Sequence, residues 1–159
     1  HLNISLGLCY RYFDSKQKLF QEAMQQYVED LCASYLVTLH DEALHFHEKL
    51  DALFLMLEQE EQQMRYHDFF HRPENIGFHE ELAVKLCKYM QPHLQKELHI
   101  YLKKHHLKVR HEELLLSFLT YGQIGLHASV NSPNPELLAH LRAYFDLLLK
   151  QECIPDDSQ

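Results

Sequence analysis

Residues 2–19 read LNISLGLCYRYFDSKQKL, and this stretch sets the expected fold of the whole chain. Asn3 tolerates the left-handed backbone of a tight turn, and Ser5 is a favourable N-cap for a helix of about two turns. Ser15 can cap a second helix that starts at Lys16. A short helix after a turn, followed by a longer helix, is how helix-turn-helix proteins mount a recognition helix.

Ten residues between positions 4 and 20 match a known sequence signature in type and spacing. They are Ile4, Ser5, Gly7, Tyr10, Tyr12, Phe13, Ser15, Lys16, Leu19 and Phe20. In this order they resemble the signature of the tetracycline-repressor (TetR) family, across its recognition helix and the start of its fourth helix. Asn3 stands where the family usually has a turn glycine, and Cys9 where an aliphatic residue is commoner. The resemblance implies that the first two helices of the DNA-binding domain are missing from this sequence.

The resemblance also implies a ligand-responsive, DNA-binding transcriptional repressor with an all-α fold. Residues 1–39 would hold the rest of the helix-turn-helix head, with the recognition helix at about 6–13, and the connecting helix. Residues 40–151 would form a ligand-binding and dimerisation domain, and residues 152–159 a flexible tail. The positions that match the DNA-contacting motif are Ser5, Leu6, Gly7, Tyr10, Arg11, Tyr12 and Lys16. By position, Tyr10, Tyr12 and Lys16 would meet phosphates, and Ser5, Leu6 and Arg11 would lie nearer base edges.

The charge of the chain is unevenly distributed. The net charge is −8 over 159 residues, of which 46% are hydrophobic, enough for a sizeable core. Residues 1–19 carry Arg11, Lys16 and Lys18 against Asp14, a local charge of +2, so the remaining residues carry −10. A basic head on an acidic body is compatible with DNA contact at one end only.

Composition also favours a cytoplasmic protein. The sequence has neither an apolar run of about eighteen residues, as a membrane span requires, nor a signal-peptide pattern. Its cysteines, Cys9, Cys32, Cys87 and Cys153, are scattered without a CxxC motif. This spacing favours free thiols in a reducing compartment.

Residues 8–72 contain neither Gly nor Pro, which predicts a succession of helices. We expect no strand. We expect helices over residues 16–39, 44–62, 111–130 and 135–150, and a short helix that ends before Pro73. Residues 74–78 read as a turn with Gly77 as its hinge. From His79 a long helical pattern resumes, in which Pro92 either kinks one helix or starts a second.

The last two predicted helices carry two features of a helix–helix interface. Gly122, Gly125 and Ser129 leave room for another helix to approach closely, and the final helix offers a broad apolar stripe with Leu137, Leu141, Tyr144 and Leu148. Both features are also compatible with packing in the core of one chain. The resemblance favours a homodimer, because TetR-like proteins pair through a four-helix bundle of two C-terminal helices from each subunit.

The middle helices supply bulky aromatic residues and flexible thioethers. We expect them to line a pocket for a small hydrophobic or aromatic effector. The expected lining is Phe54, Leu57, Met64, Phe69, Phe78, Leu86, Tyr89, Met90, Phe118 and Tyr121, with Gln123 and His127 as further polar groups. At least half of these residues would serve equally well as ordinary core.

Fourteen histidines raise the alternative of a His-rich metal-binding or metal-sensing protein. His67 and His71 are four residues apart on a predicted helix and would be the nucleus of such a site. The histidines are spread along the chain, without an HExxH motif or a Cys/His block, so we expect neither a metal site nor a cofactor. The sequence also lacks a nucleophile elbow and a phosphate-binding glycine loop, and we expect no enzyme activity.

Overall fold

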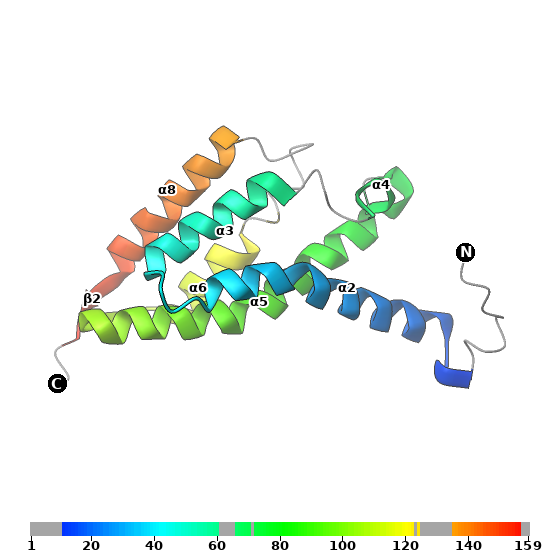
Figure 1. Ribbon diagram of the computed structural model, residues 1–159, viewed down its shortest axis with the longest axis horizontal. Helices are drawn as coiled ribbons and strands as arrows, with labels where there is room; N and C mark the ends of the chain where they lie inside the picture. The colour runs from blue at the N-terminus through cyan, green and yellow to red at the C-terminus, as the bar shows by residue number, and fades with distance from the viewer. Residues whose placement is uncertain (1–10, 61–65, 71, 123, 125–134, 157–159) are drawn as a thin grey trace.

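The computed structural model describes residues 11–60, 66–70, 72–122, 124 and 135–156, and it shows the expected all-α fold with one small sheet (Figure 1). The helices are α2 (Lys16–Leu39), α3 (Phe46–Glu60), α4 (His67–Phe70), α5 (Ile76–His105), α6 (Glu112–Tyr121) and α8 (Pro135–Glu152), with a 3-10 helix η2 (Pro73–Asn75). The strands are β1 (Leu107–Val109) and β2 (Cys153–Pro155). Within the described residues, no helix is both long enough and apolar enough to cross a membrane.

Helix α2 has the predicted boundaries because its cap forms as expected. The backbone of Ser15 is extended, and its side chain accepts a hydrogen bond of 3.0 Å from the amide of Lys18. At the other end, the amide of His40 donates to the carbonyl of Leu36 at 2.9 Å. The lack of Gly and Pro between these ends allows 24 residues to form one helix.

Helix α5 corrects one prediction and decides another. The predicted turn at residues 74–78 is wrong, because Pro73 starts the helix η2 and α5 begins directly after it. Gly77 therefore lies in the first turn of α5, at a cost of about 1 kcal/mol relative to Ala, which packing can offset. Pro92 lies inside a single 30-residue helix and does not divide it. Figure 1 shows α5 running beneath α3 and α8, with α2 crossing its middle.

The sheet is a second correction, because we expected no strand and a flexible tail from residue 152. Strand β1 pairs with β2 in antiparallel register, with Lys108 opposite Ile154. His106 ends α5 in the left-handed conformation, with φ 54° and ψ 46°, and its carbonyl accepts a hydrogen bond from the amide of Asp156. Strands of three residues are too short to show a period of two, so the sequence pattern missed them.

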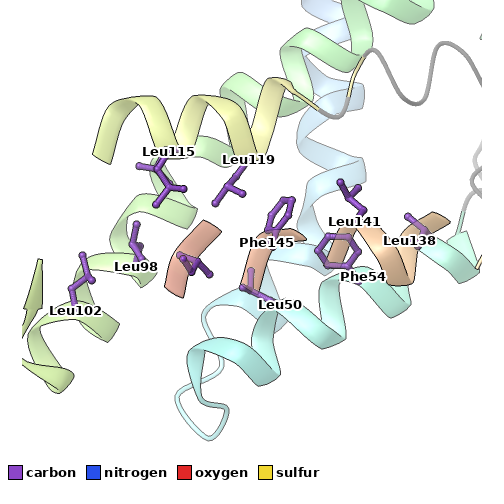
Figure 2. Close-up of a cluster of buried hydrophobic side chains, with 11 residues drawn as sticks. Leu50, Phe54, Leu98, Leu102, Leu115, Leu119, Leu138, Leu141 and Phe145 are labelled. Atoms are coloured by element: carbon purple, nitrogen blue, oxygen red, sulfur yellow. The ribbon is translucent and has the colours of Figure 1, made fainter. Parts of the chain in front are cut away.

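One hydrophobic cluster, which we call the body cluster, joins α3, α5, α6 and α8 (Figure 2). The rings of Phe54 and Phe145 meet edge to face in it, with centroids 5.2 Å apart. The buried members are Leu50, Phe54, Leu98, Leu102, Leu115, Leu116, Leu119, Leu138, Leu141, Phe145 and Leu149. Because these residues come from both halves of the chain, the body cluster fixes the helices of the C-terminal part into one unit.

A second cluster, the α2 cluster, holds α2 against α4 and α5. Its buried members are Met24, Val28, Cys32, Phe70 and Leu82. Along α5, Tyr89 and Met90 pack against the α2 cluster, and Leu94 packs against the body cluster. The surface between α2 and α5 is therefore a core separate from that of the C-terminal helices.

Candidate functional site

Four polar side chains, two of them buried, lie between the two hydrophobic clusters, and we call them the junction cluster. It consists of His40 at the end of α2, Lys49 on α3, and His93 and Glu97 on α5. Lys49 and Glu97 are only 6% and 5% exposed. Charged side chains are almost never buried to this extent unless they are paired. The burial of Lys49 and Glu97 therefore depends on their contact with each other.

The hydrogen bonds of the junction cluster form a chain. Lys49 Nζ donates to one oxygen of Glu97 at 2.5 Å, and His40 Nδ1 lies 3.1 Å from the other oxygen. An ionised carboxylate only accepts, so His40 must carry its proton on Nδ1. The other ring nitrogen of His40, Nε2, lies 3.1 Å from Nδ1 of His93. Three helices are thus connected through one row of polar atoms.

The electrostatics of the junction cluster favour an ionised Glu97 and a neutral His93. Burial raises the pKa of Glu97, but the hydrogen bonds from Lys49 and His40 outweigh it and bring this pKa below its ordinary value. Burial lowers the pKa of His93, and the charges of His40 and Lys96 lower it further.

Sequence patterns alone do not bring the four residues of the junction cluster together. The signal was a lysine within an otherwise apolar stripe of α3, where Phe46, Leu50 and Leu53 repeat at helical spacing. A charge on a buried helix face needs a partner, but the sequence does not say which carboxylate provides it. Glu97 is 48 residues away and meets Lys49 only through the tertiary fold.

Five residues of the predicted effector pocket lie at or next to the α2 cluster. Leu86, Tyr89 and Met90 pack against it directly. Phe69 contacts the buried ring of Phe70, with centroids 5.2 Å apart, and stacks on Phe78 at 6.2 Å. Phe78 also meets Phe20 of α2 at 4.7 Å. This part of the prediction therefore concentrates between α2, α4 and α5.

The other predicted pocket residues are dispersed. Phe54 belongs to the body cluster, Leu57 and Tyr121 are half-buried on α3 and α6, and Phe118 is exposed on α6. Met64, Gln123 and His127 lie outside the described residues. The members of the predicted set that the structure describes therefore do not line one common pocket.

The thiols at the contact of α2 with α5 are unreactive. Burial raises the pKa of Cys32 to about 12, and the neighbouring charge of Cys87 adds to this effect. Burial likewise raises the pKa of Cys87 to about 11, and its thiol donates to the carbonyl of Thr120 at 3.3 Å. Both thiols therefore stay protonated near neutral pH.

Two hollows open on the surface of the described part of the chain, away from the predicted pocket. One, of about 410 Å³, is lined by His99, Leu102, Lys103, His106, Leu107, Lys108, Val109, Glu112 and Asp156. The other, of about 570 Å³, is lined by His47, Asp51, Tyr101, Leu107, Arg142, Asp146, Leu149, Lys150 and Cys153. Their charges are largely paired within the hollows.

The pairing is clearest in the larger hollow. Arg142 lies 2.7 Å from Asp51 and 2.6 Å from Asp146, and His47 lies 3.0 Å from the same Asp146. In the smaller hollow, Glu112 already accepts from His99 at 2.6 Å. Side chains of opposite charge that pair in this way hold helices together and leave little charge for a ligand.

Three of the predicted DNA-contacting residues can be placed. Arg11, Tyr12 and Lys16 are exposed directly before or at the start of α2, and the Tyr12 side chain is 77% exposed. Figure 1 shows the first turns of α2 extending beyond the other helices. The remaining four, Ser5, Leu6, Gly7 and Tyr10, lie outside the described residues.

The predicted dimer residues divide between core and surface. Leu141 is buried in the body cluster, Leu137 and Leu148 are half-buried, and Tyr144 is exposed. Gly122 ends α6, where an added Cβ would collide with the carbonyl oxygen of Phe118 in the same chain. The contact with Phe118 in the same helix is therefore enough to explain a glycine at position 122. Gly125 and Ser129 lie outside the described residues.

The predicted nucleus of a metal site cannot be placed. The side chain of His67 and the whole of His71 lie outside what the structure describes. Among the described residues, no group of three or more His, Cys, Asp and Glu side chains is arranged to hold a metal ion. Comparisons of the chain with protein-family models, with curated proteins and with solved structures give no match.

Proposed function

We propose that this chain is the sensing and pairing part of a TetR-type transcriptional regulator, a cytoplasmic homodimer released from its operator by a small hydrophobic or aromatic effector. The observation that carries the proposal is the placement of α2. One end of this helix follows the exposed Arg11 and Tyr12, and the other end is fixed by the junction cluster through His40. A rigid helix with its ends so placed can transmit a movement from body to head.

Because α2 is long, a small rotation about its C-terminal end displaces the head by several ångströms. Its 24 residues span about 36 Å at 1.5 Å per residue. A rotation of about 5° about the junction cluster would move the far end by roughly 3 Å, comparable to known helix shifts in switching proteins. In a two-fold dimer, both heads would move, and their separation would no longer match the two half-sites of an operator.

The α2 cluster is the place where an effector would act. Its apolar and aromatic side chains, with the rings of Tyr27, Phe69 and Phe78 around it, suit a flat hydrophobic molecule. A ligand that binds better when α2 is displaced from α5 would shift the population toward that arrangement. The low reactivity of Cys32 and Cys87 supports non-covalent binding.

Helices α6 and α8 would form the homodimer interface. Each helix buries one apolar face in the body cluster and still exposes large apolar side chains on another. These are Leu114 and Phe118 on α6, and Tyr144 and Leu147 on α8, all at least 60% exposed. Exposed apolar residues at helical spacing on two neighbouring helices favour a helix–helix interface with a second copy.

Removing the positive charges at the head is expected to weaken DNA binding. In the full-length protein, Arg11→Ala combined with Lys16→Ala should raise the dissociation constant for DNA upstream of its own gene by about tenfold or more. The logarithmic salt dependence should become less steep by about 1.8, because two phosphate contacts are lost. Fluorescence anisotropy over a salt series measures both quantities.

Lys88→Ala provides the matched control, because this lysine is exposed on α5 rather than at the head. It should leave both the affinity and the salt slope unchanged. If the double variant bound DNA with the affinity and salt slope of the control, Arg11 and Lys16 would not contact DNA, and the head would be wrongly assigned.

A further inference from the structure

The hydrogen bond between His40 and His93 depends on how many protons the two rings carry. Glu97 requires a hydrogen on Nδ1 of His40, which leaves Nε2 of the same ring facing Nδ1 of His93 at 3.1 Å. When both rings are neutral, His93 donates from Nδ1 and Nε2 of His40 accepts. The two nitrogens then share one hydrogen, and the contact is satisfied.

One added proton keeps the contact. If it binds Nε2 of His40, that nitrogen donates to His93, which shifts its remaining hydrogen to the outer nitrogen. The hydrogen bond is then charge-assisted and stronger than the neutral one. The added charge then lies on the ring that already bonds the carboxylate of Glu97.

A second proton breaks the contact. Both facing nitrogens then carry a hydrogen, so neither accepts, and two positive rings lie with centroids 5.2 Å apart. The surrounding groups are Lys49 from α3, Lys96 and Glu97 from α5, and the ring of Tyr89, whose centroid is 5.8 Å from that of His93. Glu97 is already shared by Lys49 and His40, so it cannot neutralise a second imidazolium.

We propose that the His40–His93 pair is a proton-operated latch, closed with no proton or one proton added and opened by two, which fastens the C-terminal end of α2 to α5. The side chain of His40 is 33% exposed, so water can deliver the protons. The lowered pKa of His93 agrees with this, because folding then favours its neutral form. Because folding lowers the pKa of His93, the unfolded chain binds a proton at this ring more readily below about pH 6.5, so the stability from a neutral His93 is present above that pH and is lost as the pH falls.

The consequence for regulation rests on the proposed function. Opening the latch removes one of the two contacts that hold His40 against α5, while the bond to Glu97 remains, so the end of α2 is loosened rather than released. A regulator with this latch would hold its heads in register near neutral pH and lose the register in acid. The opening itself does not depend on DNA binding, so it can be tested separately.

Two substitutions of His93 isolate the latch. His93→Asn retains a donor and an acceptor near the position of Nδ1 but cannot take up a proton, so it should stay closed. His93→Lys places a permanent charge and only donors there, so it should be closed while His40 is neutral and opened by a single proton on His40. His99→Asn is the matched control, because His99 is also on α5 but pairs with Glu112, away from the junction cluster.

Hydrogen–deuterium exchange of the last turn of α2 is the measurement, with rates corrected for the intrinsic effect of pH. Between about pH 7.5 and about pH 5, protection of these amides should fall about tenfold in the wild-type protein and in His99→Asn. Protection should change little in His93→Asn and should fall in acid in His93→Lys, where one proton on His40 is enough to remove the acceptor. Amides of α8 report any global loss of stability.

The proposal is overturned if the last turn of α2 keeps its protection in acid, or if His93→Asn loses it as the wild type does. Should His93→Lys fail to fold, the comparison of the wild type with His93→Asn still decides. If the last turn of α2 loses protection in acid as expected but the protein does not bind DNA, the proposed function is refuted and the latch is not. Effector-dependent DNA binding, with no pH-dependent change in protection at the end of α2, would refute the latch and leave the proposed function intact.

Discussion

Replacing Glu97 with glutamine is expected to lower the free energy of unfolding by about 3 kcal/mol, because it leaves the buried charge of Lys49 without its partner. The change alters the shape of the side chain little, so lost packing is not the cause. The amide keeps one acceptor oxygen, so Lys49 and His40 can no longer both donate to this side chain. Urea unfolding followed by circular dichroism near pH 7 measures the difference.

Two further variants make this result specific. Adding Lys49→Met to Glu97→Gln removes the unpaired charge and should recover most of the lost stability, since a buried pair contributes little compared with apolar side chains of similar volume. Glu112→Gln removes a more exposed carboxylate that also pairs with a histidine of α5, and it should cost below about 1 kcal/mol. Equal losses for Glu97→Gln and Glu112→Gln would mean that the junction cluster does not hold the helices together.

A single charge on α8 is expected to separate the proposed dimer. Leu147 is 61% exposed and apolar, and Leu147→Glu would place two carboxylates in a two-fold interface. The loss of two buried leucines alone corresponds to about 3 kcal/mol, or at least a hundredfold rise in the dimer dissociation constant. Sedimentation velocity over a range of protein concentrations measures this constant.

Leu55→Glu is the matched control for the dimer, because Leu55 is similarly exposed but lies on α3. It should leave the dissociation constant unchanged. A wild-type protein that stays monomeric at high concentration, or a Leu147→Glu variant that pairs as tightly as the wild type, would remove α8 from the interface.

The sequence was sufficient for the long helices because the signals there are local. The cap at Ser15 and the absence of breakers define α2 without any knowledge of the fold. The same kind of local reasoning failed at Gly77, where the proximity of Pro73 suggested a turn. Packing of α5 against α2 and η2 outweighs the small cost of a glycine in a first helical turn.

The site was harder to predict because its residues meet only in the folded chain. Composition identified aromatic residues suited to a pocket, but it could not distinguish Phe54, which fills the body cluster, from Phe118, which is exposed. Likewise, the stripe with Leu141 was compatible with both core and interface, and Leu141 lies in the core. Side chains of one chemical type serve either purpose, and only the tertiary contacts separate them.

The most direct test of the account measures operator binding with and without an effector. A thermal-shift screen of flat aromatic compounds selects those that stabilise the full-length protein most, and anisotropy then gives its affinity for DNA upstream of its own gene. We expect a saturating concentration of a stabilising compound to raise the DNA dissociation constant at least about tenfold, a coupling of about 1.4 kcal/mol. DNA affinity that is equal with and without every such compound would contradict the account.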